Sequence, residues 1–303
     1  MWEYVEYALE EANKYDVDFV EVRGEVQKSM LIRFMNNIVK SVESTQLVGV
    51  GITVVIGKSR GHGFTTDLSK ESIRNAIIQA VNSARGFSSL AGISAEPVEY
   101  SPKDYAGFIP SRNKDPEKIE LGEKIELVMR GINTIMAKSK EAMITAYYAE
   151  LCGERFFLNS EGLKRYWRPM RNGIYYHVVV RKNGNIGVSR ELFASSYGLE
   201  IYEKKKPEDI AKKALNGALE SLEAKTLKPG KYPLVADPDF AGVLAHESFG
   251  HLTEGDYVAT KASILYGRLG DQVGSEYATI IESGDPVNYG FYIPYDDEGV
   301  ATI

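Results

Sequence analysis

Cysteine is almost absent from this sequence, since Cys152 is the only one among 303 residues. A single cysteine excludes an internal disulfide and fits a reducing, intracellular setting. The first residues, 1–4, lack the basic and then apolar pattern of a secretory signal peptide. These features predict a cytoplasmic protein.

Long hydrophobic runs and an excess of basic residues are also missing. No apolar stretch reaches the roughly 18 residues that a membrane-spanning helix needs. The net charge is −6 and the pI is about 5.5. The basic run Lys204–Lys206 is short, and we interpret it as the solvated flank of a helix. A protein that binds DNA directly is expected to carry a basic patch. We therefore expect no direct nucleic-acid partner and no membrane partner, and we regard any link to DNA as indirect.

Histidine is scarce as well, with four in the chain, yet two of them flank a glutamate in the segment HESFGH at 246–251. Two imidazoles can hold a zinc ion, and a neighbouring carboxylate can take a proton from the hydrolytic water. This is the chemistry of zinc peptidases, whose usual motif is H-E-x-x-H with histidines four residues apart. In this chain His246 and His251 are five residues apart, with Glu247 beside the first.

The spacing of His246 and His251 conflicts with a regular helix. Residues five apart are offset by about 140° around a helix, so both rings could not easily reach one ion. A π-type turn, or a bend at Gly250, would bring the two rings together. Of these two solutions we favour the bend or bulge.

The helix that carries the motif is predicted to begin at Asp237. Asp237 suits the N-cap position and Pro238 suits the first helical position. Residues 240–250 are mostly apolar or small, which predicts a buried helix. The histidines could be core residues with Glu247 as their hydrogen-bonding partner, but a bound cation would directly offset the cost of burying these groups.

The rest of the chain alternates between strand and helix patterns. Strand-like alternation covers 17–66 and 142–200, and Asn-Gly pairs mark tight turns in the second region. Helical periodicity covers four segments, namely 2–14, 69–84, one that starts after Pro116, and 207–222. Because these elements do not alternate as regular β-α-β units, we predict an α+β fold with a mixed or antiparallel sheet and flanking helices.

A compact Leu-Lys-Pro-Gly linker at 227–230 is the clearest boundary in the chain. We predict an N-terminal α+β domain at 1–226 and a β-rich C-terminal domain at 227–303, of which this chain contains a part. The second domain carries the 246–251 motif, and 232–236 is predicted to be a strand just before the helix.

With its surroundings, this motif resembles the TldD/PmbA family, named as modulators of DNA gyrase and understood as metallopeptidases. The resemblance extends over essentially the whole chain and follows the family's order. Its most specific part is LAHESFGHLTEGD at 244–256. The other matching segments are DFVEVR at 18–23, VGVG at 48–51, GFTT at 63–66, NSEG at 159–162, Ser263 with Gly267 and Gly270, and YDDEG at 295–299.

The TldD-like branch of this family keeps H-E-x-x-x-H, and the PmbA-like (TldE) branch lacks it. The resemblance therefore implies that His246 and His251 are zinc ligands and that Glu247 is the general base. It also implies an unfolded or extended peptide as substrate, and assembly with a PmbA/TldE-like subunit or with a second copy of the chain.

One departure from the family concerns the third zinc ligand, which is a cysteine near the C-terminus of its members. This chain stops at Ile303 and Cys152 does not match that position, so we expect a C-terminally truncated member. Glu254, Asp256 or Asp296 could complete the site, since carboxylates also bind zinc. Glu254 and Asp256 could instead contact the metal ligands from outside the site, or cap or brace the turn after the helix.

The leading hypothesis is thus a zinc metallopeptidase subunit. The alternative is an inactive or regulatory peptide-binding subunit that lacks a complete metal site, because the expected cysteine ligand is missing. Cys152 is expected to be a small buried side chain, and His62 and His177 are expected to be structural.

Overall fold

The computed structural model describes residues 1–87 and 103–302, which fall into two compact units. The first unit contains Met1–Ala224 together with Ser283–Ile303, and the second contains Lys225–Glu282. The second unit is therefore inserted in the sequence of the first, which the chain leaves after residue 224 and rejoins at residue 283.

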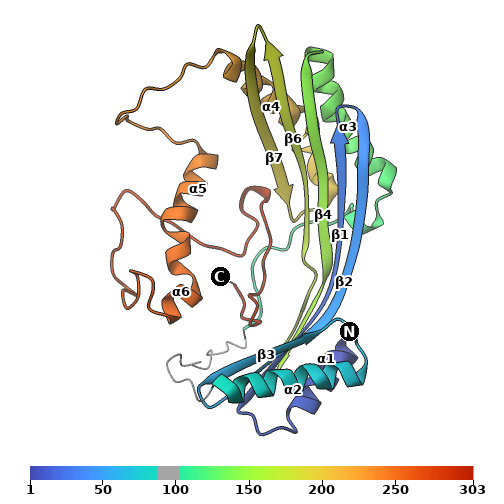
Figure 1. The fold of residues 1–303 in the computed structure, drawn as a ribbon, viewed down its shortest axis with the longest axis vertical. Helices are drawn as coiled ribbons and strands as arrows, with labels where there is room; N and C mark the ends of the chain where they lie inside the picture. Colours follow the sequence, from blue (N-terminus) through green and yellow to red (C-terminus); the bar gives the residue numbers. More distant parts are fainter. Residues whose placement is uncertain (88–102, 303) are drawn as a thin grey trace. The chain divides into compact units, whose positions relative to one another are not determined.

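The first unit is built on an antiparallel sheet with long, curved strands (Figure 1). The strands follow the order β3-β2-β1-β4-β6-β7, and β5 pairs with β4. These strands occupy both regions in which alternation predicted them, and the predicted α+β class is confirmed. Their bounds are Phe19–Met35 for β1, Ile38–Ile56 for β2, Ser59–Thr65 for β3, Ala142–Asn159 for β4, Lys164–Trp167 for β5, Met170–Lys182 for β6 and Asn185–Ser195 for β7.

The helices of the first unit pack on the sheet in two pairs, which are α1 with α2 and α3 with α4. Val20 and Val22 of β1 contribute to the core under the first pair, and Ile32 and Phe34 to the core under the second. All four are even-numbered residues of one strand, so both cores lie on the same face of the sheet. The helix bounds are Trp2–Ala12 for α1, Lys70–Phe87 for α2, Leu121–Lys138 for α3 and Pro207–Glu223 for α4, and 3₁₀ turns form at Pro116–Lys118, Leu199–Glu203 and Val287–Tyr289.

The start of α2 agrees with the sequence better than its end. Ser69 Oγ accepts a hydrogen bond from the backbone N of Ser72 at 3.2 Å, as expected of an N-cap. The described part of α2 ends at Phe87, one residue beyond the predicted stop at Gly86. After Pro116 the chain first makes a 3₁₀ turn, and α3 begins only beyond it.

The second unit consists of short helical elements and irregular chain. Three elements follow one another, namely α5 (Pro238–Ser248), a 3₁₀ turn (Gly250–Thr253) and α6 (Gly255–Ala259). The predicted strand at 232–236 is not formed, because no described segment pairs with its backbone. Between 227 and 302 the β pairing is limited to one isolated bridge, Tyr295 with Ala301, so the β-rich character expected there is not seen in the described residues.

The prediction that the motif helix is buried is wrong. Phe240, Val243 and Leu244 of α5 are 48%, 56% and 51% exposed. The helical elements of the second unit are too few and too short to form a layer over α5. Ser263 is the only buried residue in the whole of 225–282.

None of the helices in the described residues has the length and apolar character that a membrane span requires.

The YDDEG segment at 295–299 lies against the sheet of the first unit. Arg165 donates a hydrogen bond from Nε to the carbonyl oxygen of Gly299 at 3.3 Å, and the rings of Trp167 and Tyr295 are 5.5 Å apart. A side chain at Gly299 would come within 2.7 Å of Phe157, and its φ of +74° also favours glycine. The sheet therefore holds this segment in place.

Candidate metal centre

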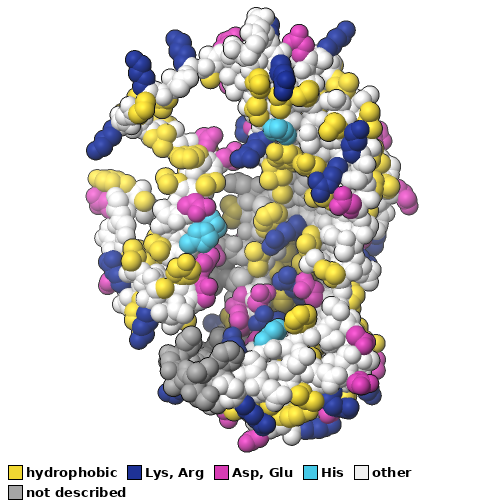
Figure 2. Space-filling view, viewed as in Figure 1, with side chains coloured by type: hydrophobic (Ala, Val, Ile, Leu, Met, Phe, Trp, Pro, Cys, Tyr) yellow, Lys and Arg dark blue, Asp and Glu magenta, His cyan; other side chains and the backbone are white. Residues whose placement is uncertain are grey.

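Helix α5 positions the first two residues of the motif. Asp237 Oδ1 accepts a hydrogen bond from the backbone N of Phe240 at 2.8 Å, and Pro238 occupies the first helical position, so both predicted start signals are confirmed. His246 and Glu247 lie in the last turn of this helix. In Figure 2, histidine and acidic side chains lie next to one another on the surface over α5.

A bend after α5 brings in the third residue of the motif. The helix ends at Ser248, and Phe249 leaves the helical conformation with φ −134° and ψ −45°. His251 then lies in the 3₁₀ turn Gly250–Thr253. The structure thus has the bend rather than the π-type turn, and the break falls at Phe249, one residue before the predicted Gly250.

The bend places two imidazoles and a carboxylate together. The ring centroids of His246 and His251 are 4.5 Å apart, with an interplanar angle of 67°. One ligand-type atom from each of His246, Glu247 and His251 lies within 4.8 Å of the other two. All three side chains are accessible to solvent, and Glu247 is 64% exposed. Two imidazole nitrogens are donors that suit zinc, and the carboxylate of Glu247 lies beside them.

The acidic residues after the motif do not join this group. Glu254 Oε1 lies 2.9 Å from Nδ1 of His251, so its carboxylate contacts a ring of the group. Asp256 Oδ1 accepts a hydrogen bond from the backbone N of Tyr257 at 2.8 Å, its neighbour within α6. Asp296, in the first unit, accepts hydrogen bonds from the backbone N of both Glu298 and Val300 within its own turn.

Cys152, His62 and His177 are all in the sheet of the first unit. Cys152 is 3% exposed, and burial, with the nearby Glu150 carboxylate, raises the pKa of its thiol to about 12. Such a thiol stays protonated at neutral pH, as expected of a small buried side chain. His62 Nδ1 lies 3.1 Å from Thr53 Oγ1, and desolvation followed by the charge of Arg23 lowers the pKa of His62. No second group of three ligand-type side chains occurs in the described part of the chain.

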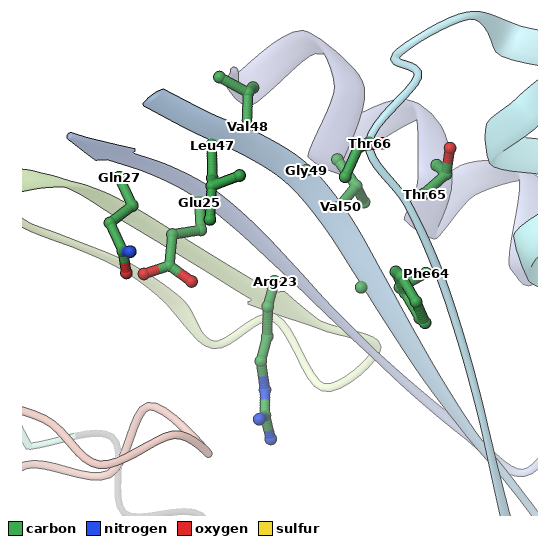
Figure 3. A pocket seen from close by; sticks show the side chains of 11 residues that line it. Arg23, Glu25, Gln27, Leu47, Val48, Gly49, Val50, Phe64, Thr65 and Thr66 are labelled. Carbon is green, nitrogen blue, oxygen red and sulfur yellow. The ribbon is translucent and has the colours of Figure 1, made fainter. Parts of the chain in front are cut away.

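The sheet has a cavity that was not predicted from the sequence. A cavity of about 310 Å³ is lined by residues of β1, β2 and β3, among them Arg23, Glu25 and Phe64 (Figure 3). Gly49 and Gly51 line it without side chains, which helps to leave this space open. The VGVG segment at 48–51 was therefore a usable signal, because glycines inside a strand often mark such a gap.

A larger cavity, of about 480 Å³, spans neighbouring strands of the same sheet. Ala149, Gly173 and Ala194 line it and stand opposite one another in the strand register. The rings of Tyr147 and Tyr175 also line it and are stacked 5.5 Å apart. Three small residues in one row are visible only once the register of the strands is known, so sequence alone could not show this cavity.

Profiles of one protein family match three successive parts of the chain. The PmbA/TldA metallopeptidase domain 1 matches residues 20–84, the central domain matches 114–222, and the C-terminal domain matches 229–303. The chain belongs to the PmbA/TldD family. The resemblance seen in the sequence motifs is thereby confirmed, and the 246–251 motif falls inside the match to the family's C-terminal domain.

Curated relatives of this chain carry the word metalloprotease in their names. The metalloprotease of Methanocaldococcus jannaschii is 31% identical over 292 residues, which are 93% of this chain and 62% of the relative. The metalloprotease TldD homologue of Haemophilus influenzae is 28% identical over 264 residues, which are 83% of this chain and 53% of the relative. This PmbA/TldD chain thus spans between about half and three fifths of the length of these relatives.

The fold of this PmbA/TldD chain is also found in a solved structure. The crystal structure of a proposed modulator of a DNA gyrase from Thermotoga maritima matches with a TM-score of 0.79, covering 100% of this chain and 67% of that one. The two sequences are 21% identical, so the likeness shows a shared fold and carries no further argument.

Proposed function

We propose that this chain is a TldD-like metallopeptidase subunit that hydrolyses peptide bonds in unfolded or extended peptides. His246 and His251 would hold one zinc ion, and Glu247 would act as general base. The observation that carries the proposal is the bend at Phe249, which gathers the three side chains so that one ligand-type atom of each lies within 4.8 Å of the others.

The donor set agrees with a peptidase mechanism. When bound, zinc supplies a Lewis acid that polarises the scissile carbonyl group. Glu247 follows His246 in sequence, and its Oε2 is 3.8 Å from Nε2 of His251. Its carboxylate therefore lies close to both proposed zinc ligands. From there it would take a proton from the attacking water and return it to the leaving amine. Its exposure of 64% leaves it open to water and substrate.

The exposure of the site supports an extended substrate. A segment of unfolded chain can bring its backbone to the accessible side chains of the group, whereas a folded protein holds most of its peptide bonds inside secondary structure. Phe240, Val243 and Leu244 present apolar surface on the same helix. Exposed apolar surface of this kind is typical of interaction sites, and a PmbA/TldE-like subunit or a second copy is the proposed partner.

Hydrolysis of an unfolded polypeptide tests this proposal. The purified chain would be incubated with a reduced and carboxymethylated protein in the presence of zinc, alone and with a PmbA/TldE-like subunit, and products would be followed by mass spectrometry. We expect cleavage that stops when a strong chelator removes the metal and returns when zinc is restored. Cleavage that the chelator leaves unchanged would contradict the proposal, as would a zinc-loaded chain that cleaves nothing in either mixture.

A further inference from the structure

The two ring nitrogens of His251 face different groups. Nδ1 lies 2.9 Å from Oε1 of Glu254. Nε2 lies on the side of Glu247, 3.8 Å from its Oε2. His251 therefore stands between two carboxylates, one inside the group of ligand-type side chains and one outside it.

The contact with Glu254 selects one form of the His251 ring. An ionised carboxylate only accepts hydrogen bonds, so the proton of a neutral imidazole must be on Nδ1 to make this contact. Nε2 then keeps its lone pair, and that lone pair is what a metal ion binds. Metal-binding histidines commonly donate their other ring N–H to a carboxylate, which fixes the orientation of the ring and strengthens the ligand.

The local backbone explains why Glu254 is available for this contact. His251 and Glu254 are three residues apart at the 3₁₀ turn Gly250–Thr253, and side chains at this spacing lie above one another in a 3₁₀ turn. Glu254 is also the N-cap residue of α6, yet its side chain makes no capping hydrogen bond. Its carboxylate therefore contacts the His251 ring and does not cap the helix that follows.

A buried serine braces the turn from another side. Ser263 Oγ donates a hydrogen bond to the carbonyl oxygen of Leu252 at 2.6 Å and accepts one from the backbone N of Leu265 at 3.1 Å. Ser263 is 5% exposed, whereas the residues around it are exposed or partly exposed. Thr253 Oγ1 adds a hydrogen bond to the carbonyl oxygen of Gly250 at 2.8 Å. A braced turn keeps His251 and Glu254 in register with each other.

We infer that Glu254 is a positioning residue of the metal centre, whose carboxylate holds His251 so that Nε2 is presented to the ion. The inference rests on the proposed function and deepens it. It also decides between the roles open to Glu254, because its carboxylate acts through the His251 ring and not as a further ligand. Asp256, two residues on, accepts a hydrogen bond from the backbone N of Tyr257 within α6.

Metal affinity in a set of variants tests this inference. Replacing Glu254 by alanine removes the acceptor, and we expect zinc binding to weaken by about 10- to 100-fold. Glu254→Gln keeps a neutral acceptor and should weaken binding less, and Glu254→Asp, which keeps the charge, should restore part of the affinity. Asp256→Asn is the matched control, because it alters a neighbouring carboxylate that does not touch the ring, and its affinity should equal that of the wild type.

The affinities would be measured by competition with a chromophoric chelator, and the ligand geometry by the visible spectrum of the cobalt-substituted chain. Thermal unfolding of the metal-free variants should be unchanged, so that loss of affinity is not loss of fold. If the wild type binds no zinc, the proposed function fails. If the wild type binds zinc and the Glu254→Ala variant binds it equally well with the same cobalt spectrum, the inference about Glu254 alone is overturned.

Discussion

Replacing Glu247 by glutamine is expected to lower the rate of peptide hydrolysis by about 10²- to 10⁴-fold, the usual contribution of a general base. Glutamine has nearly the same size and shape as glutamate, but its amide does not accept a proton from water. His246 and His251 are untouched by the change, so the variant should keep its zinc. The measurement is the single-turnover rate on an unfolded peptide, together with the zinc content of the same sample.

The zinc content of Glu247→Gln distinguishes two roles for this carboxylate. Its oxygen lies within 4.8 Å of the ligand-type atoms of both histidines, so a direct bond to the ion is the competing interpretation. A variant that loses both zinc and activity would support a ligand role and contradict the role of base. Glu276→Gln is the matched control, because Glu276 is an exposed glutamate of the same unit and should retain both zinc and rate.

Replacing Lys124 by methionine is expected to destabilise the first unit by about 3–5 kcal/mol, the cost of breaking a buried ion pair. Lys124 Nζ and Glu150 Oε1 are 2.8 Å apart, and the two side chains are 3% and 8% exposed. The hydroxyl of Tyr148 donates a second hydrogen bond to Glu150 at 2.5 Å. Burial and the charge of Glu150 raise the pKa of Tyr148, which keeps this donor protonated. Without Lys124, the Glu150 carboxylate would remain buried without its counterion.

Two further variants test this explanation by chemical denaturation. Lys212→Met breaks an exposed pair with Asp209 and should cost no more than about 1 kcal/mol. The double variant Lys124→Met with Glu150→Leu removes both charges and should recover much of the lost stability, since apolar pairs often replace buried ion pairs without loss. A Lys124→Met variant as stable as Lys212→Met would show that the buried pair does not have this role.

Local signals made most of the first unit predictable from sequence. The alternation of β1 and β2 and the periodicity of α2 depend on residues close together in the chain, and each element formed where its pattern indicated. The start of α5 was predictable for the same reason, because Asp237 and Pro238 act within one helical turn. The H-E-x-x-x-H spacing also favoured a bend or bulge over a regular helix between the two histidines, and α5 ends at Ser248.

The predictions that were wrong concern features that depend on packing or pairing with distant parts of the chain, which a sequence does not reveal. The strand expected at 232–236 has no neighbour to pair with among the described residues, and the second unit has too few helical elements of its own to cover the apolar side of α5. The sequence pointed to Glu254 as a residue at or beside the site, but it did not show the contact of Glu254 with His251. This contact forms because the chain enters a 3₁₀ turn after Phe249. Neither a histidine nor a glutamate in the sequence predicts such a turn.

The metal content of the purified chain tests the central claim most directly. Zinc would be measured per chain by elemental analysis after mild dialysis, for the wild type, for His246→Ala, and for His62→Ala as a control outside the group. The account predicts about one zinc ion per chain in the wild type and the control, and none in His246→Ala. A wild type without zinc, or a His246→Ala variant that keeps the wild-type amount, would contradict it.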